Sequence, residues 1–115
     1  MIGVIFEVLP HERHKQEYLD IAASLRPELE KIKGFISIER FQSLSDPNKI
    51  LSLSFYENEA ALDEWRNLHS HRSAQSKGRG GLFEDYRIRI ISVVRDYGMF
   101  EREEAPKDSR DLHDN

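Results

Sequence analysis

The sequence has no cysteine, no long apolar run and no excess of basic residues. The absence of cysteine excludes disulfides, thiolate nucleophiles and cysteine metal sites. No apolar stretch approaches the roughly 20 residues that span a bilayer, and the N-terminus lacks the basic and apolar segments of a signal peptide. Lys and Arg total 17 against 21 Asp and Glu, a net charge of -4, which argues against nucleic-acid binding. We therefore expect a cytoplasmic protein that binds neither nucleic acid nor a membrane.

The composition predicts one small folded domain followed by a polar tail. With 115 residues, 38% hydrophobic and 33% charged, the chain can form one core but is small for a deep enclosed pocket. From Glu101 onward the only apolar side chains counted are those of Ala105 and Leu112. We expect residues 1–100 to form the domain, and residues 101–115 to be a mobile tail or to lie on another surface.

Residue periodicity predicts an alternation of strands and helices. Period-two patterns predict strands over 2–9, 35–41, 50–56 and 86–97. Helical spacing predicts a helix over 14–33, kinked or divided at Pro27 and ended by Gly34, and another that starts after an Asn58 cap. Ser70 is predicted to begin a further short helix after a break, ended by Gly78. The order β-α-β-β-α-β predicts an α+β, ferredoxin-like fold with a four-stranded antiparallel sheet.

The first predicted strand is apolar on both faces, so helices should cover one face and something other than water the second. Glu7 interrupts that second face. A carboxylate in the middle of a strand must be paired, hydrated or shifted in pKa. An ion pair with Arg87, Arg89 or Arg40 and a catalytic role are both open, and the two are compatible.

Titratable and aromatic groups concentrate between residues 55 and 81, which include the only Trp and two of the five His. Trp65 and His71 flank the predicted helix break, where side chains can line a cavity. His71 is the best candidate for a general base because imidazole titrates near neutrality, although a solvated or capping His is the alternative. His69 and His71 should point to different sides of a helix, so we expect no metal site from this pair.

Four segments carry a resemblance to a known family: Lys33-Gly34-Phe35, the run from Leu51 to Arg66 (LSLSFYENEAALDEWR), His71 to Gln75 (HRSAQ) and Arg95 to Gly98 (RDYG). With the β-α-β-β-α-β order, the chain resembles the antibiotic biosynthesis monooxygenase family over about residues 1–100. The resemblance implies a homodimeric α/β barrel in which two sheets pack face to face. It also implies a pocket in each subunit between sheet and helices, near Trp65.

Members of this family include cofactor-independent oxygenases of aromatic polyketides, quinol oxygenases and haem-degrading enzymes. We expect a monooxygenase that oxidises a small aromatic or quinol-like molecule with dioxygen, without a bound metal or flavin. The catalytic candidates are His71, Glu7 and Trp65, and the candidates for substrate contacts are Arg72, Gln75, His69 and Phe55. A non-catalytic dimeric barrel that binds a small ligand or another protein is the alternative from a different class.

Haem binding, with or without degradation, is a third possibility. The haem-degrading branch uses an Asn on the first strand, a Trp on the second helix and a haem-ligating His about ten residues later. Trp65 matches the Trp, whereas Glu7 and Gln75 stand at the other two positions. We therefore expect no sharp His-ligated haemin spectrum.

Overall fold

The computed structural model describes residues 1–77 and 81–113, with the side chains of 69–77 and 113 outside the description. The strands are β1 (Ile2–Pro10), β2 (Phe35–Gln42), β3 (Ile50–Tyr56) and β4 (Phe83–Ser92). The helices are the 3-10 turn η1 (Glu12–His14), α1 (Lys15–Glu30), α2 (Glu59–Lys77) and α3 (Lys107–His113). This order confirms the predicted α+β class and the β-α-β-β-α-β core.

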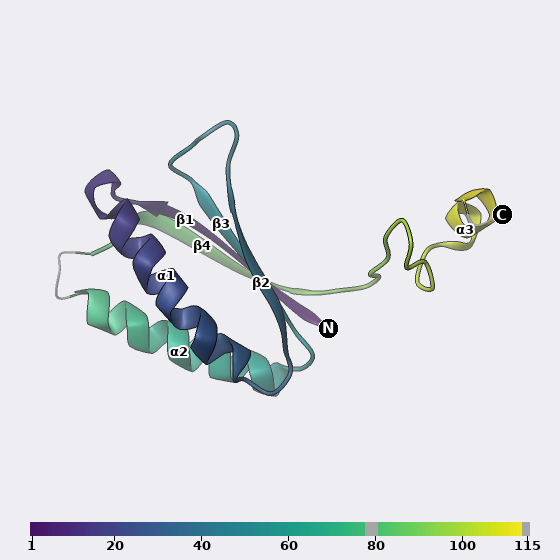
Figure 1. Cartoon of the computed structure of the whole chain (residues 1–115), viewed down its shortest axis with the longest axis horizontal. Coiled ribbons are helices and arrows are strands. Elements are labelled where there is room, and N and C mark those ends of the chain that lie inside the picture. Colours follow the sequence, from purple (N-terminus) through teal and green to yellow (C-terminus); the bar gives the residue numbers. More distant parts are fainter. Residues whose placement is uncertain (78–80, 114–115) are drawn as a thin grey trace.

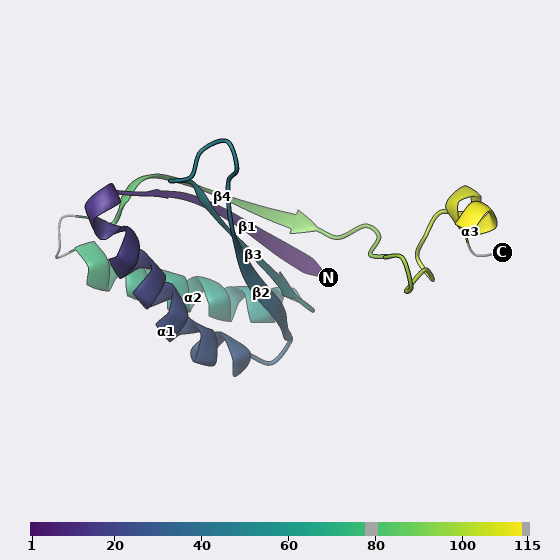
Figure 2. The same ribbon diagram turned by 45° about the horizontal axis from the view of Figure 1, so that its top comes forward.

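The four strands form one sheet in the order β2-β3-β1-β4, and each neighbouring pair is antiparallel. Helices α1 and α2 both lie on one face of this sheet, as Figures 1 and 2 show. The opposite face carries no element of the described chain in either view. The ferredoxin-like arrangement predicted from the sequence is therefore confirmed.

Helix α1 passes through Pro27 without division and ends at Glu30. Of the two effects predicted for Pro27, division of the helix is therefore wrong, and a kink stays a prediction. Proline removes one backbone hydrogen bond to the carbonyl four residues earlier, here that of Ala23. Ala23 and Pro27 are both exposed, so water can satisfy that carbonyl. Gly34 follows the helix with φ +94°, and a Cβ there would lie 3.2 Å from the Ala61 Cβ. Gly34 thus permits both the turn and the close approach of α2.

Helix α2 runs from Glu59 to Lys77 without interruption, so the predicted break at Ser70 is wrong. Its start matches the sequence, because the Ala61 N–H donates a 3.0 Å hydrogen bond to Asn58 Oδ1. No Gly or Pro occurs within the helix, and the cap-forming tendency of Ser70 does not outweigh continued helical hydrogen bonding. Trp65 and His71 therefore lie on one continuous helix. Gly78 lies outside the described residues.

The core lies between the sheet and the two helices, as two groups of buried side chains. The first group is Val4, Leu29, Ile32, Ile38, Tyr56, Ala61 and Trp65. The second is Phe6, Val8, Tyr18, Ala22 and Ile50. Alternate residues of each strand point to the helices, so these groups draw on one parity of β1, β2 and β3.

The chain after β4 leaves the sheet and carries α3 away from the rest of the domain, as both ribbon views show. Strand β4 begins at Phe83 and ends at Ser92, which is earlier at both ends than predicted. Arg102 organises the tail locally, donating to the Gly98 carbonyl at 2.8 Å and to Ser109 Oγ at 2.7 Å. Sequence analysis did not predict α3.

None of the helices in the described part of the chain is both long enough and apolar enough to cross a membrane.

Candidate functional site

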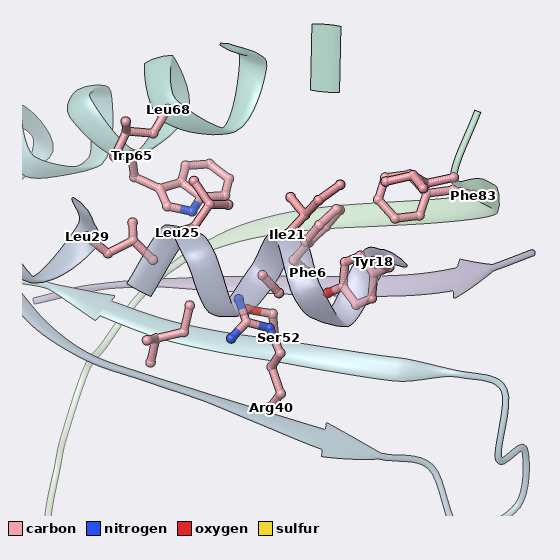
Figure 3. Close-up of a pocket in the computed structure, with 13 residues that line it drawn as sticks. Phe6, Tyr18, Ile21, Leu25, Leu29, Arg40, Ser52, Trp65, Leu68 and Phe83 are labelled. Carbon is pink, nitrogen blue, oxygen red and sulfur yellow. The ribbon is translucent and has the colours of Figure 1, made fainter. Parts of the chain in front are cut away.

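A cavity of about 60 Å³, continuous with solvent, lies between the helix-bearing face of the sheet and helices α1 and α2 (Figure 3). Most of its lining is apolar and comes from the four strands, helices α1 and α2, and the segment just before β4. The lining residues are Phe6, Tyr18, Ile21, Ala22, Leu25, Leu29, Ile38, Arg40, Ser52, Trp65, Leu68, Leu82 and Phe83. Its position between sheet and helices, next to Trp65, is where the family resemblance implied a pocket.

Arg40 reaches this cavity because strand register places it on the helix-bearing face. It pairs with Ser52 on β3, and Ser52 pairs in turn with Phe6 on β1. Residues paired across antiparallel strands share a face, so the three side chains form a row beneath the helices. Arg40 Nε is buried and has no hydrogen-bond partner among the described residues. No described carboxylate forms an ion pair with Arg40 either.

Tyr18 extends from α1 into the same cavity, and its side chain is 5% exposed. Figure 3 shows its hydroxyl pointing toward the Arg40 guanidinium. Burial raises the pKa of Tyr18 above its usual value, and the adjacent Arg40 charge opposes this only in part. The phenol therefore stays protonated at neutral pH. Tyr18 can donate a hydrogen bond into the cavity, but it is a poor proton acceptor.

Aromatic rings form one end of the cavity. Phe83 stands edge-on to Tyr18, with ring centroids 5.5 Å apart, and to Phe6, at 6.1 Å. Such edge-to-face contacts are the favoured geometry of aromatic pairs. Trp65 contributes its indole from α2 and is 8% exposed. The site thus offers a planar or apolar molecule several rings to pack against, with the polar groups of Arg40, Tyr18 and Ser52 at one place.

Two of the residues proposed from the sequence do not reach this cavity. Glu7 lies on the opposite face of the sheet, where its Oε2 is 3.2 Å from Arg89 Nη1 and 3.8 Å from Lys49 Nζ. The expected cross-sheet ion pair is thus formed with Arg89. Phe55 also lies on that opposite face, beside Gly3. Within one chain, the structure therefore brings neither side chain to the site.

Trp65 does line the cavity, although its catalytic role stays a prediction. The other four proposed site residues are His69, His71, Arg72 and Gln75, which lie on α2 with side chains outside the described residues. Among the described residues, no group of three His, Asp or Glu side chains is placed to hold a metal ion.

Arg40 and Tyr18 were missed by sequence analysis. Arg40 gave no clear signal on the second strand, because its parity carries Ile36, Ile38 and Gln42 while the opposite parity carries Phe35, Ser37, Glu39 and Phe41, so the two are equally apolar. Tyr18 gave no signal either, because an aromatic residue on the apolar face of a helix is typical of a core.

A haem does not fit the described lining. Iron in haem proteins is held by His, Cys, Met or Tyr side chains. Among the described lining residues only Tyr18 is of these types, and its raised pKa opposes the phenolate form that binds iron. Glu7, at the position where the haem-degrading branch has Asn, faces away from the cavity.

The family model described as "Antibiotic biosynthesis monooxygenase" matches residues 1–77. A curated relative from Pyricularia oryzae, "Jasmonate monooxygenase ABM", is 51% identical over 94 residues, which are 82% of this chain and 44% of the relative. The chain therefore spans less than half the length of that relative.

Among solved structures, Rv0793 from Mycobacterium tuberculosis superposes with a TM-score of 0.72 at 15% identity, covering 84% of this chain and 98% of that one. A variant of MhuD with two manganese protoporphyrin IX molecules bound per active site gives 0.65 at 16% identity, covering 85% and 99%. Similarity at this level of identity supports the fold alone.

Proposed function

Because the chain belongs to the antibiotic biosynthesis monooxygenase family, we propose that it oxidises a small, largely apolar molecule with dioxygen in the cavity that Arg40 and Trp65 line. The observation that carries the proposal is the lining itself, in which aromatic and aliphatic side chains surround a few convergent polar groups. Cavities of this composition are typical small-molecule sites. The cavity is about 60 Å³ and is continuous with solvent, so we propose that a larger substrate extends out of it.

We propose an aromatic or quinol-like substrate that supplies the electrons itself, so that neither a metal nor a flavin takes part. Removal of a proton from an activated ring methylene or phenol gives an electron-rich anion that reduces dioxygen. In oxidation of a methylene to a carbonyl, one oxygen atom enters the product and the other leaves as water with the two hydrogens. The substrate loses four electrons and dioxygen gains four, so the reaction balances.

His71 is the proposed proton acceptor, since imidazole is the side chain whose pKa suits this step near neutral pH. Trp65 is proposed to hold the ring system by stacking and to keep water away from the anion. Arg72, Gln75 and His69, on the same helix, remain proposed substrate contacts. The positions of Glu7 and Phe55 give no support to their proposed roles within a single chain.

The relative from Pyricularia oryzae widens the range of substrates to test. Its name makes jasmonate a second candidate, proposed here only as a member of a panel because the chain matches less than half of that protein. Hydroxylation of an unactivated C–H bond by dioxygen consumes two further electrons. Assays with jasmonic acid must therefore include an external two-electron donor.

Oxygen consumption with a panel of hydroquinones, anthrones and jasmonic acid tests the proposal. We expect at least one compound to be turned over, and His71→Ala to slow that turnover by about 10²–10⁴-fold with little loss of stability. His11→Ala is the matched control, because His11 is not among the described residues that line the cavity and its ring pairs with Glu84 at 3.7 Å. Equal rates for the two variants would remove His71 from the mechanism. Binding of panel compounds with no oxygen consumption by any of them would favour the alternative of a non-catalytic barrel.

We also propose that two copies associate through the uncovered face of the sheet, forming a cytoplasmic homodimer. That face carries Ile5, Leu51, Leu53, Phe55 and Ile91. A large uncovered apolar face is unusual in a monomer, and a two-fold partner would bury it. Sedimentation should give a dimer at micromolar concentration, and Leu53→Lys should shift it toward monomer. A stable wild-type monomer would contradict this association.

A further inference from the structure

We propose that Arg40, Tyr18 and Ser52 form a carboxylate-binding subsite, so that the substrate of this cavity is a mainly apolar acid bound through its anionic head group. The inference adds the substrate class to the proposed function and uses the same cavity. It concerns binding, so it can hold even if no oxidation occurs.

The first step of the argument is the environment of Arg40. Its side chain enters a cavity lined mostly by aliphatic and aromatic residues, and its Nε is buried without a hydrogen-bond partner among the described residues. The described carboxylates nearest along the strands, Glu7 and Glu39, lie on the opposite face of the sheet. Arg40 is half-buried, and its neighbour Tyr18 can hydrogen-bond to it but carries no charge that offsets the guanidinium. An unpaired buried donor is costly, and charges removed from water are normally compensated by a counter-ion or hydrogen bonds. An anionic ligand would provide that compensation.

The second step is the convergence of donors from three elements. Arg40 comes from β2, Tyr18 from α1 and Ser52 from β3, and Figure 3 shows the three polar ends gathered at one place. Ser52 is 6% exposed and stands opposite Arg40 in the strand register. The guanidinium can only donate, and the protonated Tyr18 hydroxyl can donate beside it. A group of donors of this kind is complementary to an acceptor with two oxygen atoms.

The third step decides between a carboxylate and a more highly charged group. Arg40 is the only cation among the described lining residues, so this part of the lining supplies one positive charge. One guanidinium matches a carboxylate in charge and in its two-pronged geometry. A phosphate dianion would leave one negative charge that the described lining does not compensate. The rest of the lining then suits an apolar body packed against Phe83, Trp65 and Leu25.

The test compares an acid with its neutral isostere in the full-length protein. Binding of 4-phenylbutanoate and of 4-phenylbutanamide is measured by calorimetry and by Trp65 fluorescence at pH 7. We expect the acid to bind about tenfold more tightly than the amide, because only the acid forms charge-assisted hydrogen bonds. Arg40→Met should bring the two dissociation constants together, and Arg40→Lys should restore part of the preference.

Arg26→Met is the matched control, since it removes the same charge from the exposed side of α1 and should leave the preference unchanged. Equal binding of acid and amide by the wild type, binding of neither, or an acid preference that survives Arg40→Met would each overturn the subsite. Tight acid binding without oxygen consumption would sustain the subsite and reject the proposed oxidation. Efficient turnover of a neutral quinol at a rate that Arg40→Met leaves unchanged would support the proposed oxidation and reject the subsite.

Discussion

Replacing Arg40 and Tyr18 together should make the unliganded protein more stable than replacing either alone. Arg40 Nε is buried without a partner, and a buried unsatisfied donor costs about 1 to 3 kcal/mol. Arg40→Met removes that penalty with an apolar side chain of similar length. The same change leaves the Tyr18 hydroxyl, on a residue 5% exposed, without its charged neighbour, which costs about as much. We therefore expect Arg40→Met to lie within about 1 kcal/mol of the wild type.

Adding Tyr18→Phe removes the second unsatisfied group. The double variant should exceed the wild type by about 1 to 3 kcal/mol in free energy of unfolding, since both penalties are then gone. Tyr18→Phe alone should change the stability by less than about 1 kcal/mol, so the two substitutions couple favourably. Urea unfolding followed by Trp65 fluorescence and circular dichroism gives the four free energies of this cycle.

The outcome separates a functional from a structural Arg40. A binding residue that is costly in the empty protein is expected when stability is exchanged for function. A double variant less stable than the wild type by more than about 1 kcal/mol would show that Arg40 and Tyr18 stabilise the fold, and the argument for an unpaired charge would fail.

Three further predictions concern other parts of the chain. Glu7→Gln should lower stability by no more than about 1 kcal/mol, because its pairs with Arg89 and Lys49 are partly exposed, and a sharp loss of ligand binding in a titration would contradict its placement on the far face. Burial raises the pKa of Tyr56 to about 12, with Ser54 and Arg40 opposing the shift, so only the unfolded state ionises between pH 10 and 12 and stability should fall there as pH rises. Tyr56→Phe should remove about 1.4 kcal/mol of that alkaline loss when urea titrations at pH 8 and pH 11 are compared, and an unchanged loss would refute the assignment. Deleting residues 101–115 should leave the melting temperature within a few degrees, because α3 projects from the domain; insoluble protein would instead show that the tail holds the fold or the dimer together.

The fold could be predicted because its signals are local and agree with one another. Each signal depends on a few neighbouring residues, and together the signals define the element order. They are the alternation of apolar and polar residues in β1, β2 and β3, the Asn58 cap of α2 and the turn at Gly34. The boundaries that failed depended on competing local preferences. Ser70 can cap a helix and Pro27 can end one, yet both lie inside helices that the surrounding residues continue.

The site was harder to predict because its residues meet only through the sheet register and helix packing. Trp65 could be proposed from its place in the family resemblance. Arg40 and Tyr18 are 22 positions apart, and their proximity depends on how α1 crosses β2. Glu7 was proposed as a site residue because its position in the strand is unusual, but strand parity alone could not show which face the helices cover.

The central claim, that this cavity performs an oxygenation, is tested most directly by isotope labelling. The substrate identified in the panel is turned over under ¹⁸O₂, and the product is analysed by mass spectrometry beside parallel reactions in H₂¹⁸O. We expect one labelled oxygen atom per product molecule from ¹⁸O₂, none from rapidly quenched reactions in labelled water, and loss of labelled product in Trp65→Ala. Label acquired only from water, or labelled product formed equally well by Trp65→Ala, would contradict oxygenation at this site.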